Sequence, residues 1–265
     1  MKRITLILAF AMFASLTAIA QEKPKDGSQV KPETPKAEKP AEKAAALPTV
    51  DEILANYIKA VGGKEAIEKI SSRSAKGTFD LETFGVTGAP IELLAKAPNK
   101  SATKVDIASV GVFYRNYDGA TGWSSDPMNG LRELKGVELA QMKRSSDFYQ
   151  ELNLKNHYTK LEVKGKEKVG SYETYVIEAT PAEGVPVKYY FDVNTHLLVR
   201  QDEESESPQG KMPVEVYMDD YKVVDGVKIA HTLKQVNAAM TIVIKLSEVK
   251  NNVAIDEAKF SKPSN

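Results

Sequence analysis

The sequence predicts an α+β protein, mainly antiparallel β, built around one large sheet. Three observations indicate this fold. An amphipathic helix opens the folded part of the chain at Thr49. Short segments rich in Val, Ile, Tyr and Thr then recur almost to the C-terminus, as is typical of strands. The turns between them are short, and short turns join antiparallel neighbours.

The opening helix has a clear start and a clear end. Thr49 and Glu52 form an S/T-x-x-E capping box. Gly62 and Gly63 are expected to end the helix, and residues 64–70 restart it for about two turns. The apolar residues of the first segment share one helical stripe, which we expect to lie on the sheet: Val50, Ile53, Leu54, Tyr57, Ile58 and Val61.

Strands account for almost everything after Ser72. A sheet of this size must curl to keep its twist and to hide an apolar face, which then needs a covering helix or a ligand. One helix, over residues 136–152, interrupts the strands. The strands are expected at residues 73–83, 89–97, 101–108, 111–118, 121–125, 158–165, 172–180, 186–192, 197–204, 213–221, 227–236 and 241–249.

Two hairpins are well marked. The segment 187–201 is expected to turn at residues 192–196, and the second hairpin turns at the dipeptide Asp225-Gly226. One face of the first hairpin is expected to carry Val187, Tyr189, Phe191, Leu197 and Val199.

The stretch "YDGATGWSSDP" (117–127) contains the single tryptophan and allows two interpretations, a catalytic loop or a tight turn. Asp118 and Gly119 suit a turn, and Gly122 suits a position with positive φ. A catalytic loop would need a partner for Asp118, and none is near it in sequence. We therefore predict a turn, with Trp123 opening the return strand.

The first residues have the pattern of a secretory signal peptide, predicted over residues 1–20. A positive head (Lys2 and Arg3) precedes an apolar run and a small-x-small site before Gln21. A membrane anchor is the alternative, but the apolar run is shorter than the roughly 20 residues that a spanning helix needs. Export to the periplasm is therefore expected.

Residues 21–48 are rich in Lys, Glu, Pro and Ala and contain no aromatic residue. Such a segment buries too little apolar area to offset its ordering entropy, so a disordered linker is predicted. A spacer is the favoured role, and a contact with the cell wall is the alternative. We expect the folded domain to cover residues 49–265.

Composition excludes several classes of protein. The chain has no cysteine, so its stability must come from a core, and no lipobox cysteine can carry a lipid anchor. Lys plus Arg and Asp plus Glu each number 36; removing Lys2 and Arg3 leaves 34 against 36, a net charge of −2. A nearly neutral chain has no basic field for nucleic acid, so no nucleic-acid partner is expected.

The sequence shows no catalytic motif, so we predict a binding protein and not an enzyme, with no cofactor. Ser101 and Lys104 have the spacing of a serine–lysine dyad but fall in a predicted strand without its companions. No G-x-S-x-G, G-x-G-x-x-G or Walker motif occurs. The histidines, His157, His196 and His231, are far apart in sequence and form no metal-binding pattern, so no metal site is expected.

Four motifs occur in order: "YDGATGW" (117–123), "YFDVNTHLLVRQ" (190–201), "DDYKVVDGVKIAH" (219–231) and "IDEAKFSKP" (255–263). Together with the helix "DEILANYIKAVGG" (51–63), they make residues 47–263 resemble the outer-membrane lipoprotein-sorting and lipid-carrier superfamily of LolA/LolB-like proteins. Two positions depart from that pattern. His196 stands where relatives usually carry glycine, and Ala230 where many carry proline.

The resemblance implies an open, strongly curved half-barrel of about eleven strands, with helices covering its concave side. It also implies a periplasmic carrier that binds the acyl chains of a lipid or lipoprotein in an apolar cavity, for transfer or sorting towards the outer membrane. Further expectations are a monomer, an envelope protein partner and transient membrane contact. The alternative is a non-transporting interaction module of the cell envelope, whose cavity is filled by its own side chains.

No ligand position can be carried over from the family, because the shared motifs are turns. The expected contacts are apolar residues of the concave face, and the alternative is that they pack beneath the opening helix. The candidates are Phe113, Val187, Tyr189, Phe191, Leu197, Val199, Val214, Val216, Met218, Ile229, Leu233, Ile242, Ile244 and Leu246.

Overall fold

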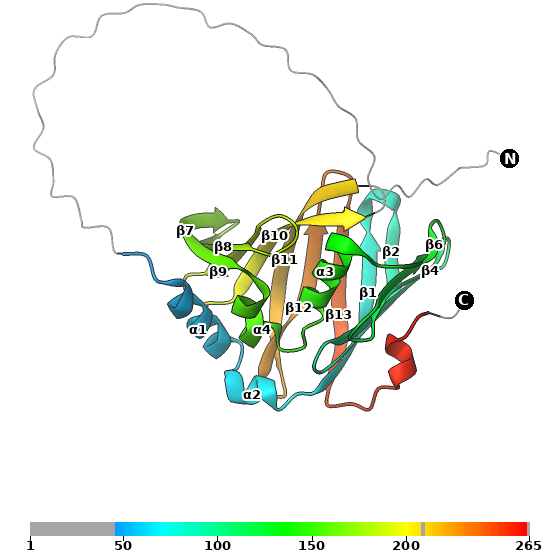
Figure 1. The fold of residues 1–265 in the computed structure, drawn as a ribbon, viewed down its shortest axis with the longest axis horizontal. Helices are drawn as coiled ribbons and strands as arrows, with labels where there is room; N and C mark the ends of the chain where they lie inside the picture. The colour runs from blue at the N-terminus through cyan, green and yellow to red at the C-terminus, as the bar shows by residue number, and fades with distance from the viewer. Residues whose placement is uncertain (1–45, 208–209, 264–265) are drawn as a thin grey trace, which may run out of the picture.

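The structure is a computed structural model that describes residues 46–207 and 210–263 (Figure 1). The predicted signal peptide and all but the last three residues of the predicted linker lie outside the described residues. Within the described ranges, no helix is long and apolar enough to cross a bilayer.

The described chain forms one antiparallel sheet of thirteen strands. The strands are β1 Ser72–Leu81, β2 Val86–Lys96, β3 Lys100–Ile107, β4 Gly111–Tyr117, β5 Gly122–Asp126, β6 Gly130–Glu133, β7 Lys160–Val169, β8 Tyr172–Thr180, β9 Val187–Asp192, β10 Leu198–Ser207, β11 Gly210–Val224, β12 Val227–Val236 and β13 Thr241–Asn251. The helices are α1 Val50–Ala60, α2 Lys64–Glu68, α3 Gly136–Ser145 and α4 Gln150–Asn153, with the 3-10 turns η1 Glu82–Phe84, η2 Leu154–His157 and η3 Glu257–Phe260.

The sheet is open, with β6 and β7 as its two edges. Its order is β6-β5-β4-β3-β2-β1-β13-β12-β11-β10-β9-β8-β7, so the first and last strands pair in the middle. The chain between β6 and β7 carries α3 and α4 across one side of the sheet (Figure 1). The predicted architecture, a curved antiparallel sheet with helices over its concave side, is confirmed.

Two details of the prediction were wrong. The strands number thirteen and not about eleven, and β6 was missed because its four residues are too few to show alternation. The helix predicted over 136–152 is two helices, because the chain turns at residues 146–149. There the Asp147 carboxylate accepts from Tyr149 N at 2.9 Å, and Phe148 N donates to Pro98 O at 2.9 Å.

Bulges contribute to the curvature of the sheet. The register shifts between Lys76 and Gly77 in β1, and again between Leu198 and Arg200 in β10. At Gly77 the strands approach so closely that a Cβ atom would lie 2.0 Å from the Lys245 carbonyl oxygen. At the second bulge Arg200, and not Val199, is the residue that pairs with Tyr190.

Helix α1 forms as the sequence predicts and packs on the sheet. Its capping box is complete, since Glu52 N donates to Thr49 Oγ1 at 3.2 Å and Thr49 N donates to the Glu52 carboxylate at 2.7 Å. Gly62 and Gly63 follow it with φ of 133° and 87°. The apolar stripe packs on β8–β10, and the Tyr57 ring centroid lies 5.2 Å from that of Phe191.

The turns follow their local sequence. Asp225 and Gly226 have φ of 50° and 84°, the two positive values of a type I′ turn. His196 has φ of 60°, a conformation that glycine adopts more easily. This φ gives a structural reason for the glycine that the resembled family pattern has at this position.

The "YDGATGW" stretch is a turn that leads into β5. The Asp118 carboxylate accepts from Ala120 N at 2.9 Å and Thr121 N at 2.8 Å, so it holds the turn. The prediction for Gly122 was wrong, because Gly119 has the positive φ, of 102°. Gly122 is needed for space, since a Cβ atom there would lie 3.0 Å from Leu134 Cδ1.

The C-terminal segment docks on the convex face of the sheet. Phe260 is fully buried against Leu94 and Ala102. Asn116 Nδ2 donates to the carbonyl oxygens of Lys259 and Ser261 at 3.1 and 2.9 Å. Lys100 and Lys96 both donate to the Glu257 carboxylate, with Lys100 Nζ at 2.6 Å.

We expect acid to loosen this segment through Glu257. The hydrogen bonds from Lys100 and Lys96 lower the pKa of Glu257 from 4.5 to about 2. Because the folded pKa is the lower one, the pairing stabilises the docked segment above pH 4.5, and that contribution is lost as the pH falls through about 2. NMR signals of the Phe260 ring should report this step, and Glu257→Gln should abolish it. Identical acid profiles for the two proteins would contradict the assignment.

Candidate functional site

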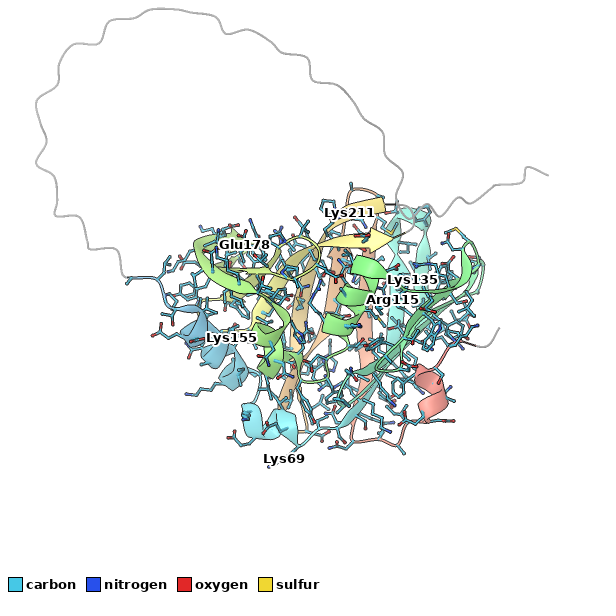
Figure 2. The ribbon with its side chains drawn as sticks, in the orientation of Figure 1. Lys69, Arg115, Lys135, Lys155, Glu178 and Lys211 are labelled. Atoms are coloured by element: carbon cyan, nitrogen blue, oxygen red, sulfur yellow. The ribbon has the colours of Figure 1, made fainter. Side chains whose placement is uncertain are left out.

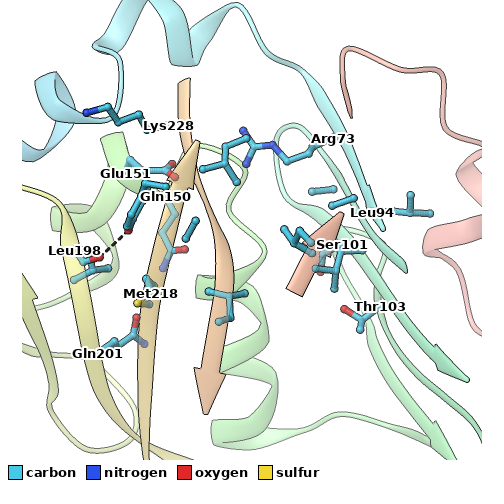
Figure 3. Close-up of a pocket in the computed structure, with 18 of the residues that line it drawn as sticks. Arg73, Leu94, Ser101, Thr103, Gln150, Glu151, Leu198, Gln201, Met218 and Lys228 are labelled. Carbon is cyan, nitrogen blue, oxygen red and sulfur yellow. Dashed lines mark hydrogen bonds between the residues drawn. The ribbon is translucent and has the colours of Figure 1, made fainter. Parts of the chain in front are cut away.

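A cavity of about 380 Å³ lies between the concave face of the sheet and the helices. Its walls come from β1–β3 on one side and β9–β13 on the other. Tyr57 of α1, Gln150 and Glu151 of α4, and Leu154 of η2 cover it. Figure 3 shows a close-up of the lining residues.

The cavity exists because small side chains from three adjacent strands face the helices. Ala75 on β1, Ala95 on β2, and Ser101 and Thr103 on β3 line it. Ala95 lies between Arg73 and Ser101 in the register of these strands. Helix α1 instead packs over the larger side chains of β8–β10, which leaves space above β1–β3.

Several polar groups in the lining already have protein partners. Tyr221 Oη donates to Leu198 O at 2.7 Å, and burial raises the pKa of Tyr221. The hydroxyl oxygens of Ser101 and Ser146 lie 2.7 Å apart. Most of the remaining wall is aliphatic, so the cavity suits an apolar ligand.

Two charged residues of the lining face each other across one end. Arg73 on β1 donates through Nε to Asn251 Oδ1 at 2.9 Å, and its Cζ lies 5.7 Å from the centroid of the Phe148 ring. Burial lowers the pKa of Arg73 and raises the pKa of Glu151. The sequence interpretation included neither residue.

The predicted ligand residues lie in several different clusters and cavities of the structure. Val187 and Phe191 are buried in the cluster beneath α1, and Leu197 packs against it. Phe113 lines a smaller cavity, of about 180 Å³, beside α3. Of the candidates, those that line the 380 Å³ cavity are Tyr189, Met218, Ile229, Leu233 and Leu246.

The other candidates lie away from the 380 Å³ cavity. Ile242 and Ile244 pack with Leu81 and Met240 in a separate apolar cluster. Val214 and Val216 are buried in β11 outside the lining. Leu198 pairs with Phe191 beneath α1, so Val199 lies on the other face, in a cluster with Val169, Val176 and Tyr190, and does not share a surface with Leu197 as the hairpin pattern predicted.

The residues considered for chemistry have structural partners. On β3, Ser101 faces the cavity, whereas Lys104 lies 6.0 Å from the Tyr114 ring centroid on the other face, so the two do not form a dyad. His157 Nε2 lies 2.7 Å from the Asp147 carboxylate, and His231 Nδ1 lies 2.8 Å from Ile229 O. In the described ranges, no three His, Asp or Glu side chains are close enough to hold a metal ion.

Helix α3 is held beside the cavity by a polar cluster. Arg132 donates two hydrogen bonds, of 2.6 and 2.7 Å, to the Glu138 carboxylate. Arg115, which Figure 2 labels, has its Nη1 3.7 Å from the same carboxylate. Gln141 Nε2 also donates to Glu204 O on β10. The Glu138 side chain is 9% exposed, so these contacts are largely desolvated.

We expect Glu138→Gln to ease local opening of α3 by about 1–3 kcal/mol, because charge-assisted hydrogen bonds are lost at a partly buried site. Hydrogen exchange of the α3 amides measures this opening. The control is Glu68→Gln, which removes an exposed pair with Lys64 at 3.7 Å and should change α2 by less than about 0.5 kcal/mol. Unchanged α3 exchange in Glu138→Gln would show that this pair does not hold the helix.

No known family model matches the sequence, and no curated protein matches it. Solved structures do resemble the fold. A DUF1329 family protein from Desulfovibrio piger has 13% identity and a TM-score of 0.56 over 80% of this chain and 97% of its own. An outer membrane lipoprotein-sorting protein domain from Vibrio parahaemolyticus has 14% identity and a TM-score of 0.54 over 80% and 95%. A LolA superfamily protein from Nitrosomonas europaea has 12% identity and a TM-score of 0.53 over 82% and 99%.

These similarities identify the class of fold as LolA-like, which confirms the resemblance found in the sequence motifs. At 12–14% identity they establish the fold alone. Two of the three carry names from lipoprotein sorting or the LolA superfamily, and none of the three names an enzyme.

Proposed function

We propose that this protein is a carrier of the bacterial envelope that binds an acyl chain of a lipid or lipoprotein in the 380 Å³ cavity. The observation that carries the proposal is the cavity itself. Its volume exceeds the roughly 300 Å³ at which ligand pockets begin, and its wall is mostly aliphatic. Each methylene moved from water into such a wall contributes about 0.8 kcal/mol.

Transfer requires no covalent step. The carrier takes up a chain from a donor and releases it to an acceptor when the binding free energies differ between the three states. The predicted signal peptide supports a periplasmic location, where both membranes are within reach. The LolA-like fold supports the same class of activity, since one similar structure is named for outer membrane lipoprotein sorting.

The alternative, an envelope interaction module with a filled cavity, is less well supported. A filled cavity would have a volume below the roughly 300 Å³ of typical ligand sites. The cavity lined by Leu93, Met218 and Leu233 has a volume of about 380 Å³. A partner protein at the acceptor membrane remains compatible with the carrier.

Native mass spectrometry of the mature protein, purified from its native host, tests the proposal. We expect lipid adducts that disappear on denaturation, and displacement of a fluorescent fatty acid by unlabelled fatty acid. Protein that is uniformly ligand-free and does not bind the fluorescent fatty acid would contradict the carrier.

A further inference from the structure

The end of the cavity that carries Arg73 and Glu151 bears one positive and one negative side chain. Figure 3 shows these two residues directed toward each other from β1 and α4, whereas Lys228 directs its ammonium away from the cavity. Gln201 and Thr103 lie at the opposite end (Figure 3). Lys228 also lines the cavity, but its ammonium is directed outward, so Arg73 and Glu151 are the charges turned toward a ligand.

The two charges do not neutralise each other by direct contact. Among the described residues, neither Arg73 nor Glu151 has an ion pair within 4.0 Å. The hydrogen bond of the Arg73 guanidinium is made by Nε, to Asn251 Oδ1, so its two Nη groups face the cavity end. Burial raises the pKa of Glu151 and lowers that of Arg73, because both charged forms lose solvation. A ligand group of opposite charge would offset this loss of solvation free energy.

The size of the cavity limits the apolar part of the ligand. At about 30 Å³ for each water-sized group, 380 Å³ holds about a dozen non-hydrogen atoms. That is the size of one acyl chain of medium length. Two or three such chains side by side would require about two or three times this volume.

We propose that the ligand is a single-chain lipid with a zwitterionic head group, whose acidic group binds the Nη donors of Arg73 and whose amine binds Glu151. This inference rests on the proposed acyl-chain function and adds the number of chains and the chemistry of the head group. A planar guanidinium binds phosphate or carboxylate oxygens in pairs, and a carboxylate accepts hydrogen bonds from an ammonium group.

Displacement of a fluorescent fatty acid by four lipids with the same acyl chain, each below its micelle concentration, tests the inference. The four are lysophosphatidylethanolamine, lysophosphatidic acid, monoacylglycerol and two-chain phosphatidylethanolamine. The first should bind about tenfold or more tightly than lysophosphatidic acid and monoacylglycerol, because hydrogen bonds to charged groups are stronger than neutral ones. It should also bind more tightly than the two-chain lipid, because the second chain exceeds the cavity volume. A fatty acid added as a fifth competitor distinguishes a carboxylate from a phosphate at Arg73.

Two variants distinguish a loss of lipid binding from a loss of folded protein. Glu151→Gln preserves shape; it should weaken lysophosphatidylethanolamine about tenfold, strengthen lysophosphatidic acid and leave monoacylglycerol unchanged. Lys76→Gln, the control, removes an exposed charge from the other face of β1 and should change none of the affinities. Failure of every lipid to displace the probe would contradict the proposed function. Equal affinities that Glu151→Gln does not alter would overturn the head-group assignment alone, and equally tight binding of the two-chain lipid would overturn the single chain.

Discussion

Ala75→Phe is expected to weaken acyl-chain binding by at least tenfold while the protein stays folded. Ala75 is 3% exposed and belongs to the group of small side chains that leave the cavity open. A phenyl ring at this position enters the space that the chain would occupy, and a loss of only two buried methylenes corresponds to about tenfold in affinity. Displacement of a fluorescent fatty acid measures the change.

The control places the same ring on the same strand but on the other face. Ser74 is the neighbour of Ala75 in β1 and pairs with Leu94, which packs on the convex side against the C-terminal segment. Ser74→Phe should leave chain binding unchanged. If both variants bind like the wild type, the cavity beneath α4 is not the site.

Phe191→Ala is expected to destabilise the protein by about 3–5 kcal/mol, the usual cost of truncating a buried phenylalanine. Phe191 is 1% exposed, and its ring centroid lies 5.2 Å from that of Tyr57 and 6.4 Å from that of Tyr189. The loss removes the contact on which α1 rests. Urea unfolding followed by circular dichroism measures it.

Tyr172→Ala is the matched control for this truncation. Tyr172 belongs to the adjacent strand β8 but is 40% exposed, so its removal should cost about 0.5 kcal/mol or less. A loss below about 1 kcal/mol in Phe191→Ala would mean that α1 does not depend on this part of the sheet. That result would also weaken the account of why α1 leaves the space above β1–β3 open.

The sequence predicted those features that depend on local chemistry. Thr49 and Glu52 define the start of α1 because both halves of a capping box lie within four residues. Asp225-Gly226 defines a turn because both residues adopt positive φ readily. The alternation of apolar residues predicted twelve of the thirteen strands. The exception was β6, which has only four residues.

The cavity could not be predicted in the same way, because it depends on register across strands. Ala75, Ala95 and Ser101 lie on three different strands. Only the pairing of β1, β2 and β3 brings their side chains to one surface. Arg73 and Ala75 are two residues apart in β1 and therefore lie on one face, the face that lines the cavity. The sequence contains this spacing, but the prediction did not use it. Glu151 reaches the cavity only because the chain breaks before α4.

The start of β10 shows how the end of a turn limits an alternation argument. Leu197 and Val199 have the same parity in the sequence, yet they pack in different clusters. Leu197 lies in the turn before β10, whereas Leu198 pairs with Phe191 and so places Val199 on the opposite face. Periodicity therefore predicts the strand but not the face of every residue within it.

The most direct test of the central claim is to locate a bound chain by photo-crosslinking. A fatty acid with a diazirine at the end of its chain would be bound, irradiated and mapped by peptide mass spectrometry. The account predicts adducts on peptides that contain Leu93, Met218 or Leu233, and their loss in the presence of unlabelled fatty acid. Adducts confined to exposed residues such as Val223, or adducts that competitor does not reduce, would contradict it.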